Sequence, residues 1–470
     1  MPTKKNAKDK QTLQLLRGFK DIMPDDQPAW LWVRQLVKQI AASYGYRRLD
    51  TPILEMENLF ARTIGEESDI VEKEMFVFTD RGGNKVTLRP ETTASFARAY
   101  VEHGLVNRPQ PVKMYYFGPQ FRYDRPQAGR YRQFHQFGFE SFGEQDAIND
   151  AQLIQLAHSL LTYELKLPIS LQVNSIGDKQ CRPQYIRSLN DYYKSRKNAL
   201  CDECKIRLKT NPLRLLDCKE KDCQELASSA PQTVDHLCEE CRDHFVRLLE
   251  YLDELELGYE LNPKLVRGLD YYTKTVFEIW PANDPEGSQS ALIGGGRYDN
   301  LVALVGGRPT PAVGFAAGVE RIISQLHKNN VVIPKADQAD VFLTQLGDKG
   351  RKKSLKLFED MRRAGINVSE SLSKDSIKSQ LEIANNLACK FSIILGQKEI
   401  MDETILIRDM ENGIQEVVDF AKAIPEIKKR LDKYQSSSIS NHEIEHPAEE
   451  KGPEKRGSEE KESEEKKSND

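Results

Sequence analysis

The spacing of apolar side chains divides the first part of the chain into predicted elements. Residues 28–40 are densely apolar and are followed by Gly45, which predicts a buried helix with a glycine stop and then a strand over 48–54. Two short runs around a Gly-Gly-Asn turn predict a hairpin over 75–88, and residues 92–103 suit a helix. This segment therefore mixes helices with short strands.

Longer strands dominate the next segment. Residues 112–122 and 133–142 are two strand-like runs joined by a loop rich in Arg, Gln and Gly, and a further strand is predicted at 168–176. Residues 181–258 are helical in pattern and rich in cysteine, which indicates an insertion, and the core pattern resumes over 259–333. Large antiparallel strands among helices predict a mixed α+β domain and not a doubly wound sheet.

A second domain is predicted after a Pro/Lys/Asp-rich linker at 334–338. Strands and helices alternate over 339–434, as in a compact α/β domain. Residues 435–470 are mainly Ser, Glu and Lys, and we expect them to be disordered because they cannot bury enough apolar surface. The chain is thus predicted to hold one core in two parts, 1–180 and 259–333, with an insertion, a second domain and a tail.

Composition agrees with several domains, since 470 residues exceed one core. The net charge of −4 comes from residues 435–470, which carry 6 basic and 11 acidic side chains. The rest is close to neutral, so any RNA contact must come from local patches. No apolar run approaches the roughly 18 residues of a membrane helix, and the lysine-rich start has no apolar segment behind it. We therefore expect a cytoplasmic enzyme.

Residues 265–277 carry the densest chemistry in the chain. Arg267, Asp270, Tyr271 and Tyr272 lie next to a β-branched strand, where burying so much polarity must be compensated. A structural strand has no need of this combination. A pocket for a small zwitterion with an aromatic side group does need it.

The strand over 133–142 has two different faces. Gln136, Gly138 and Glu140 share one face, and Phe137 and Phe139 the other. Gly138 suggests a gap in which a ligand lies on the backbone. A half-exposed sheet with a polar outer face is the alternative.

Positive charge is concentrated around the loop before this strand. Four arginines lie there: Arg122, Arg125, Arg130 and Arg132. They repel each other unless an anion is bound, and guanidinium groups suit phosphate. Upstream, Glu91 and Thr93 offer groups for an ammonium, although acidic residues at a helix start are commonly caps.

The glycine-rich run 291–299 is not a nucleotide loop of a common kind. Its third glycine position is taken by Asp299, which excludes a dinucleotide fingerprint, and the chain has no Gly-Lys-Ser/Thr element of a P-loop. Three consecutive glycines suggest instead that a substrate approaches the backbone closely.

Together these segments resemble class II aminoacyl-tRNA synthetases. The hairpin 112–142 resembles motif 2, residues 48–52 with the preceding helix resemble motif 1, and residues 314–321 resemble motif 3. Residues 265–277 and 291–299 resemble the two signatures of histidyl-tRNA synthetases. The resemblance implies an antiparallel-sheet α+β catalytic core with a helical insertion and a C-terminal α/β anticodon-binding domain.

The resemblance also implies a reaction and its partners. L-histidine would be activated with ATP and Mg²⁺ to histidyl-adenylate, releasing pyrophosphate, and then transferred to the 3′ end of tRNA(His). Motif 1 implies a homodimer, and we expect its helix and strand to have an apolar face that one subunit leaves uncovered.

Site residues follow from the matching positions. For ATP, Arg122 and Arg321 would bind phosphates, and Arg267 would stabilise charge at the α-phosphate. The histidine pocket would comprise seven residues: Glu91, Thr93, Gln136, Glu140, Arg267, Tyr271 and Tyr272. Glu91 and Thr93 would hold the ammonium, while Glu140 and Tyr272 would read the imidazole nitrogens. The tRNA acceptor end would meet Arg125, Gln127 and Arg130.

The cysteines form a separate pattern, with six of eight between 201 and 241. The pairs Cys201-x2-Cys204 and Cys238-x2-Cys241 predict one structural zinc site made of these four residues. Thiols that only pack are the alternative.

Two rival families share parts of the pattern. The synthetase-like regulatory subunit of histidine biosynthesis typically lacks the C-terminal domain and has a degraded Arg-Gly-Leu-Asp-Tyr-Tyr run, whereas this chain has both. Class II synthetases for threonine, proline or glycine share that domain but not residues 267–272. Residues 349–390 carry 10 basic and 5 acidic side chains. By itself this is typical of a solvated face; beside the catalytic motifs it favours an RNA-facing patch.

Overall fold

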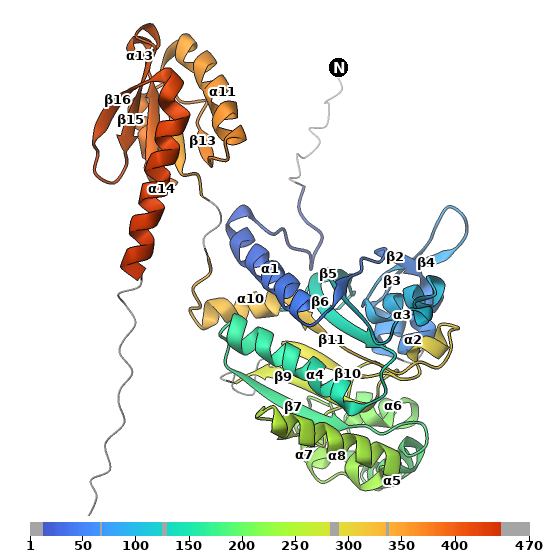
Figure 1. The fold of residues 1–470 in the computed structure, drawn as a ribbon. Helices are drawn as coiled ribbons and strands as arrows, with labels where there is room; N and C mark the ends of the chain where they lie inside the picture. Colours follow the sequence, from blue (N-terminus) through green and yellow to red (C-terminus); the bar gives the residue numbers. More distant parts are fainter. Residues whose placement is uncertain (1–12, 66–67, 125–128, 283–290, 335–337, 443–470) are drawn as a thin grey trace, which may run out of the picture. The chain divides into compact units, whose positions relative to one another are not determined.

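The computed structural model describes residues 13–65, 68–124, 129–282, 291–334 and 338–442, with only the backbone for 435–442. The chain divides into two compact units, Met1–Pro334 and Lys335–Asp470, each built around its own large sheet (Figure 1). The division falls at the predicted linker.

An eight-stranded sheet organises the described part of the first unit. Its order is β1-β5-β6-β11-β10-β9-β7-β8, and the strands from β5 to β7 pair antiparallel, with short parallel edge strands at both ends. The strands are β1 (Arg47–Arg48), β5 (Val112–Phe121), β6 (Gln133–Phe142), β7 (Ile169–Ser175), β8 (Glu260–Leu261), β9 (Thr273–Pro281), β10 (Ile293–Arg297) and β11 (Ala312–Gly318). The predicted antiparallel α+β core is confirmed.

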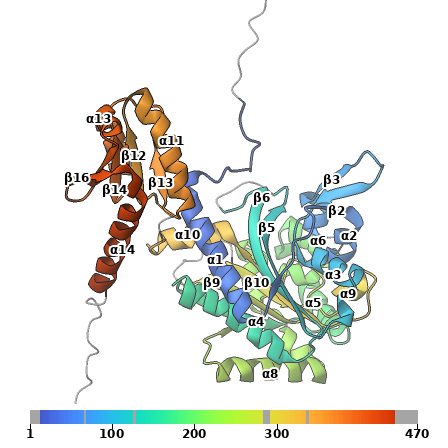
Figure 2. The ribbon, with the colours of Figure 1, turned by 45° about the horizontal axis from the view of Figure 1, so that its top comes forward.

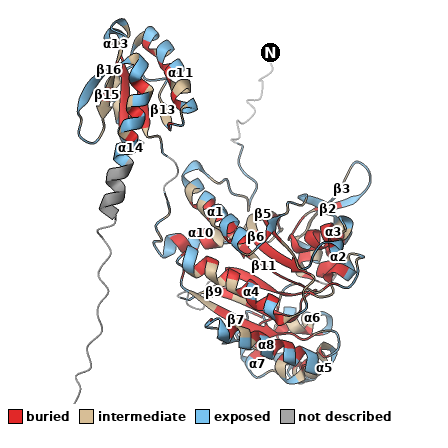
Figure 3. Ribbon diagram, viewed as in Figure 1, coloured by how far each residue is buried: buried red, intermediate tan, exposed pale blue. Residues whose placement is uncertain are grey.

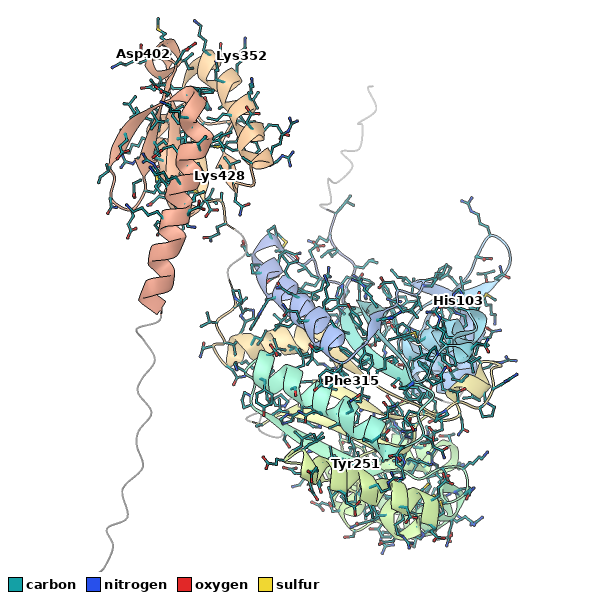
Figure 4. The ribbon with its side chains drawn as sticks, viewed as in Figure 1. His103, Tyr251, Phe315, Lys352, Asp402 and Lys428 are labelled. Atoms are coloured by element: carbon teal, nitrogen blue, oxygen red, sulfur yellow. The ribbon has the colours of Figure 1, made fainter. Side chains whose placement is uncertain are left out.

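Two apolar clusters lie on the two faces of this sheet. One holds the inner faces of α1 (Gln27–Ser43), α4 (Ala147–Ser159) and α10 (Val319–Lys328), and the other includes α3 (Thr93–Glu102) and α9 (Leu301–Leu304). The ribbon places α1, α4 and α10 along the same side of the strands (Figure 2). The strands between the helix layers are largely buried (Figure 3), and Phe315 of β11 lies in the middle of the unit (Figure 4).

The expected uncovered apolar face of the motif 1 helix and strand is found only in part. Leu31 of α1 is 54% exposed and Ile53 and Leu54 are each 43% exposed, but most apolar side chains of α1 are buried. Val33, Val37 and Ala41 are fully buried in the cluster of their own subunit, and Trp30 and Ile40 are nearly so. The periodic apolar positions of this helix therefore serve the core of the same chain.

The predicted strand over 48–54 is also wrong in its middle. Strand β1 ends at Arg48, and β2 (Leu54–Met56) belongs to a separate sheet with β4 (Lys85–Leu88) and β3 (Phe76–Thr79), next to α2 (Glu57–Ile64). The segment between them crosses from one sheet to the other. Buried Arg89 donates to the carbonyl and hydroxyl of Thr51 there, so a side chain replaces a strand partner.

The insertion is helical, as predicted. It contains α5 (Arg182–Lys194), α6 (Asp202–Thr210), α7 (Lys221–Ser228) and α8 (Glu239–Glu254). Helix α8 packs against α4, with Leu248 and Leu252 buried in the same cluster as Leu153 and Leu156. The insertion is thereby joined to the core.

A five-stranded mixed sheet forms the described part of the second unit, in the order β13-β12-β14-β15-β16. Its strands are β12 (Val341–Gln345), β13 (Val368–Glu370), β14 (Phe391–Leu395), β15 (Thr404–Asp409) and β16 (Gln415–Asp419). Its helices are α11 (Gly347–Arg363), α12 (Ile377–Asn386), α13 (Gln397–Met401) and α14 (Ala423–His442).

The prediction of disorder from residue 435 is wrong for 435–442, which continue α14. This stretch has no apolar stripe, but adding turns to a formed helix costs far less than nucleating one. Residues 443–470 lie outside the described residues. Within the described part of the chain, no helix is both long and apolar enough to cross a membrane.

Candidate active site

Strand β6 separates its side chains as the alternation predicts. Phe137 and Phe139 are fully buried in the cluster beneath α1 and α4, and Glu140 points to the other face. Gly314 of β11 pairs with Glu140, and a Cβ at Gly314 would overlap the Glu140 carboxylate. A glycine at this position is therefore required by an acidic side chain on the neighbouring strand.

The Glu140 carboxylate is fully buried and forms no ion pair with a cation among the described residues. It accepts hydrogen bonds from the hydroxyl of Thr93 (2.7 Å) and from the hydroxyl of Tyr298. Burial, together with the negative charge of Glu91, raises the pKa of Glu140 to about 8. The surroundings of this carboxylate thus suit a ligand that brings a cation or strong hydrogen-bond donors.

Three tyrosines lie together beside Glu140. The ring centroids of Tyr271 and Tyr272 are 4.7 Å apart, and Tyr298 lies 5.5 Å from the first and 6.1 Å from the second. Burial, the neighbouring Tyr272 and the charges of Glu91 and Glu140 hold the pKa of Tyr271 well above its ordinary value. The two signature segments and the strand β6 therefore meet at one place.

Glu91 is both a helix cap and a member of this group. Its carboxylate accepts the backbone N–H of Thr93 (2.5 Å) and of Ala94 (2.9 Å) at the start of α3. Burial raises the pKa of Glu91. The hydroxyl of Thr93 donates in turn to Glu140. The cap by Glu91 therefore orients Thr93 toward Glu140.

Arg267 lies against the glycine-rich strand. Its guanidinium forms an ion pair with Glu278 of β9 and lies 5.5 Å from the ring centroid of Tyr272. Burial lowers the pKa of Arg267, but Glu278 outweighs this and the net shift is upward. Its buried Nε has no hydrogen-bond partner among the described residues. A donor aimed into a buried space without an acceptor is typical of a site that a ligand completes.

A second positive group forms where the start of helix α10 lies near the loop between β5 and β6. Arg321, in the first turn of α10, donates to the carbonyl of Ala291 (3.0 Å). Burial, followed by the charges of Arg130 and Arg122, lowers the pKa of Arg321 to about 10. Arg122 donates to the carbonyl of Pro90 (3.0 Å). Three guanidiniums close enough to oppose each other's charge provide a binding place for a polyanion.

The remaining loop arginines differ in their contacts. Arg132 lies over the ring of Tyr123, 3.6 Å from its centroid, and donates to the carbonyl of Arg17. Arg130 pairs with Asp124 at 3.2 Å. The guanidinium of Arg132 is thus occupied by contacts with Tyr123 and Arg17. Arg125 and Gln127 lie outside the described residues.

Two expectations about glycine are wrong. The space over Gly138 is filled by the ring of Tyr116 and the carbonyl of Phe315, so no ligand lies there. The run Gly294–Gly296 is likewise covered, at Gly294 by the guanidinium of Arg267. These glycines admit protein side chains and backbone, and the sequence could not show which partner fills the space.

The predicted zinc ligand set is also wrong. Cys201 and Cys204 cluster with Cys218 and Cys223. Cys238 and Cys241 cluster elsewhere, with Asp178 and Cys181. The two C-x2-C pairs cannot share one ion, because helices separate them and each finds nearer partners.

A model of histidyl-tRNA synthetase matches residues 18–322, and a model of the anticodon-binding domain matches residues 331–430. The first match spans more than half of the chain. The chain belongs to the histidyl-tRNA synthetase family. Its activity is that of a histidine–tRNA ligase, an aminoacyl-tRNA ligase with the class II fold.

Relatives agree with this over most of the chain. Histidine–tRNA ligase of Dehalococcoides mccartyi is 49% identical over 415 residues, covering 88% of this chain and 99% of the relative. That of Desulforamulus reducens is 44% identical over 414 residues, covering 88% and 98%.

Solved structures agree on the fold. Apo histidyl-tRNA synthetase of S. aureus has a TM-score of 0.74 at 32% identity, covering 88% of this chain and 99% of that one. A Bacillus halodurans structure described as an ATP phosphoribosyltransferase regulatory subunit/histidyl-tRNA synthetase has a TM-score of 0.58 at 20% identity, covering 82% and 97%. The latter likeness shows the fold alone.

The histidyl-tRNA synthetase site has members that the sequence did not single out. Tyr298 donates to Glu140, and Glu278 pairs with Arg267. Tyr298 lies within the second signature, which was a usable signal. Glu278 sits in an ordinary strand pattern, and only the pairing of β9 with β10 brings it close.

Proposed function

We propose that this synthetase activates L-histidine with ATP to histidyl-adenylate, releasing pyrophosphate, and then transfers histidine to the 3′ end of tRNA(His). The observation that carries the assignment to histidine is the buried Glu140, which is met by Thr93 and Tyr298 but by no cation among the described residues. An imidazole supplies N–H donors to such a carboxyl group.

In the proposed histidine pocket, Glu140 and Tyr272 contact the two imidazole nitrogens, and Tyr271 packs along the ring. Glu91 and Thr93 hold the ammonium, although the Glu91 carboxylate also accepts two backbone N–H groups. Gln136 contributes its Oε1, a buried acceptor without a partner among the described residues. The support is that burial and hydrogen bonds bring these groups together.

ATP, delivered as its magnesium complex, is proposed to lie between Arg267 and the group of Arg122, Arg130 and Arg321. Arg122 and Arg321 bind phosphate oxygens, and Arg267 stabilises the charge that develops when the histidine carboxylate attacks the α-phosphate. Glu278 offers carboxylate oxygens of the kind that would hold magnesium, which would supply positive charge to neutralise the phosphates. The electrostatics of Arg321 support this placement, because burial and the charges of Arg130 and Arg122 lower its pKa to about 10. Bound phosphates would offset the repulsion between these arginines.

For tRNA, we propose that residues 125–130 meet the acceptor end and that α11 of the second unit contacts the RNA backbone. Arg130 supports the first contact through its closeness to Arg321. Lys352 and Lys356 support the second, because both are exposed and lie one turn apart on α11. Lys352 projects outward from this helix (Figure 4).

We further propose a cytoplasmic homodimer. Exposed apolar side chains lie on and next to the small sheet: Leu54, Met56 and Phe78 on its strands and Ile53 just before β2, each 43–47% exposed. Such a group favours burial against a second surface. A dimer mass by light scattering at micromolar concentration, and a monomer mass for a Leu54→Asp/Phe78→Asp variant, are expected. A monomeric wild-type protein would contradict the proposal.

The function is tested by ATP–pyrophosphate exchange with each of the twenty amino acids. Exchange with histidine alone is expected, followed by charging of tRNA(His). Exchange that fails while calorimetry still detects histidine binding would instead indicate a regulatory paralogue and would make the proposed arginine roles wrong.

A further inference from the structure

The insertion carries two groups of potential metal ligands that the catalytic site does not use. In the first group, Cys201, Cys204, Cys218 and Cys223 place their sulfur atoms within 4.8 Å of one another. The Sγ atoms of Cys201 and Cys218 are 3.9 Å apart. Four thiolates around one zinc ion at about 2.3 Å in a tetrahedron have sulfurs about 3.8 Å apart. The spacing thus suits a zinc ion and is far too long for a disulfide.

Backbone hydrogen bonds orient two sulfur atoms of the first group. The Sγ of Cys201 accepts the N–H of Cys204, and the Sγ of Cys223 accepts the N–H of Cys201, both at 3.4 Å. Hydrogen bonds donated to sulfur orient it and stabilise its charged form. Cysteines that only fill a core gain nothing from this arrangement.

The second group joins the two ends of the insertion. Asp178 and Cys181 lie between β7 and α5, and Cys238 and Cys241 lie at the start of α8. The four ligand atoms are again within 4.8 Å of one another. The Sγ of Cys181 accepts the N–H of Asp178 at 3.4 Å. Three thiolates and a carboxylate oxygen form a donor set that zinc accepts.

The first group lies at the base of a loop that contacts the residue 267–272 segment. Between Cys204 and Cys218, Asn211 donates to the carboxylate of Asp270 at 2.8 Å. In the same loop, Arg214 donates to the carbonyl of Gly268 at 3.3 Å. Fixing the four cysteines fixes both ends of this loop.

The second group lies beside the other end of the same segment. Arg182, next to Cys181, donates to the carbonyl of Tyr272 at 2.6 Å. Glu240, next to Cys241, pairs with Lys274 at 2.6 Å. The 267–272 segment is therefore held from both sides by residues adjacent to, or enclosed between, the two ligand groups.

We propose that the insertion binds two structural zinc ions, one through Cys201, Cys204, Cys218 and Cys223 and one through Asp178, Cys181, Cys238 and Cys241, and that together they position the Arg267–Tyr272 loop for histidine. The metal sites stand on geometry alone. Their effect on histidine rests on the proposed function, in which this loop forms part of the histidine pocket.

Metal content tests the two sites without reference to activity. Full-length protein purified without chelator is expected to contain two equivalents of zinc by mass spectrometry. Cys204→Ser and Cys241→Ser should each lose one equivalent. The matched control is Cys389→Ser, because Cys389 is also buried but lies in the second unit, outside both groups.

Several results would overturn this part. Less than a quarter of an equivalent of zinc would leave only packed thiols, and one equivalent, lost only in Cys204→Ser, would remove the second site. Iron with visible absorption would overturn the choice of metal. Should the serine variants fail to fold, chelator treatment of the wild-type protein, followed with a zinc-sensitive dye, must release two equivalents; any other stoichiometry counts against the proposal.

Kinetics test the positioning role through variants that do not touch the metal. Asn211→Ala and Arg214→Gln should retain two zinc ions and raise the KM for histidine in pyrophosphate exchange about tenfold, the scale of losing an outer support of a site. The KM for ATP should change less than about twofold. Equal changes in both KM values, or none in either, would refute positioning of the histidine loop while leaving the metal sites intact. Failure of wild-type exchange would instead refute the proposed function.

Discussion

At the scale of single residues, the site holds two unlike charges in buried surroundings. Arg267 has a carboxylate partner in Glu278, and its pKa stays raised. Within the described part of the chain Glu140 has only hydroxyl partners, and burial raises its pKa to about 8. The arginine is therefore charged and ready for an anion, whereas the carboxyl group keeps a proton near neutrality until a ligand compensates its charge.

Replacing Arg267 tests the first of these. Arg267→Ala is expected to reduce histidine-dependent pyrophosphate exchange by about two to three orders of magnitude, as removal of a preorganised electrostatic group does. Arg196→Ala is the control, because Arg196 is exposed and its contacts are local: it lies 4.0 Å from the ring centroid of Tyr192 and donates to the carbonyl of Tyr192 and the hydroxyl of Ser195. An unimpaired rate in Arg267→Ala would remove this residue from catalysis.

Glu140 should make the stability of the free enzyme depend on pH. The folded protein holds this proton up to a pKa of about 8, while the unfolded chain releases it near the ordinary 4.5. The stabilisation is therefore complete below the lower value and is lost as pH rises through the higher one. In thermal melts, the Tm of Glu140→Gln minus the Tm of wild type should increase as the pH rises from about 5 to about 8. A constant difference across this range would mean that Glu140 titrates normally.

At the scale of elements, one buried carboxylate links two elements of the core to a helix of the insertion. Arg297 of β10 is fully buried and donates through Nε to Asp150 of α4 at 3.1 Å. His244 of α8 contacts the same carboxylate at 3.0 Å. After burial is offset by the charge of Arg297 and by His244, the pKa of Asp150 falls to about 2. Three elements far apart in sequence therefore depend on one carboxylate.

Asp150→Ala should reveal this dependence. Removing the fully buried partner leaves Arg297 with the partly exposed Asp299 as its remaining ion pair among the described residues. This is expected to lower the free energy of unfolding by about 3 kcal/mol, measured by urea denaturation followed by fluorescence. Arg247→Ala removes the nearby, half-exposed pair with Asp146 and should cost less than about 1 kcal/mol. Similar losses in the two variants would show that burial does not determine the value of these pairs.

At the scale of the whole molecule, chemistry and RNA contact are expected to separate between the two units. Lys352→Glu/Lys356→Glu on α11 should raise the KM for tRNA(His) and weaken its salt dependence, because phosphate contacts are lost. Histidine-dependent pyrophosphate exchange should be unchanged. Lys398→Glu, an exposed residue on α13 of the same unit, is the control. If the α11 variant has an unchanged KM for tRNA(His), this face of α11 contacts solvent and not tRNA.

The sequence by itself determined the elements and the chemistry whose signals are local. Side-chain alternation along β6, the helix after β11 and the run 265–277 depend on neighbours along the chain, and all were predicted correctly as elements or motifs. The likeness to histidyl-tRNA synthetases followed from these motifs. Contacts between residues distant in sequence could not be predicted in the same way.

Only the tertiary structure decided which groups occupy the same space. It filled the gap over Gly138 with Tyr116, brought Tyr298 to Glu140 and Glu278 to Arg267, and divided the cysteines into two groups. Each of these depends on strand register or helix packing, where a shift of one residue would exchange the partners. Local sequence sets a side chain's chemistry and direction, whereas its partner is set by where the rest of the chain folds.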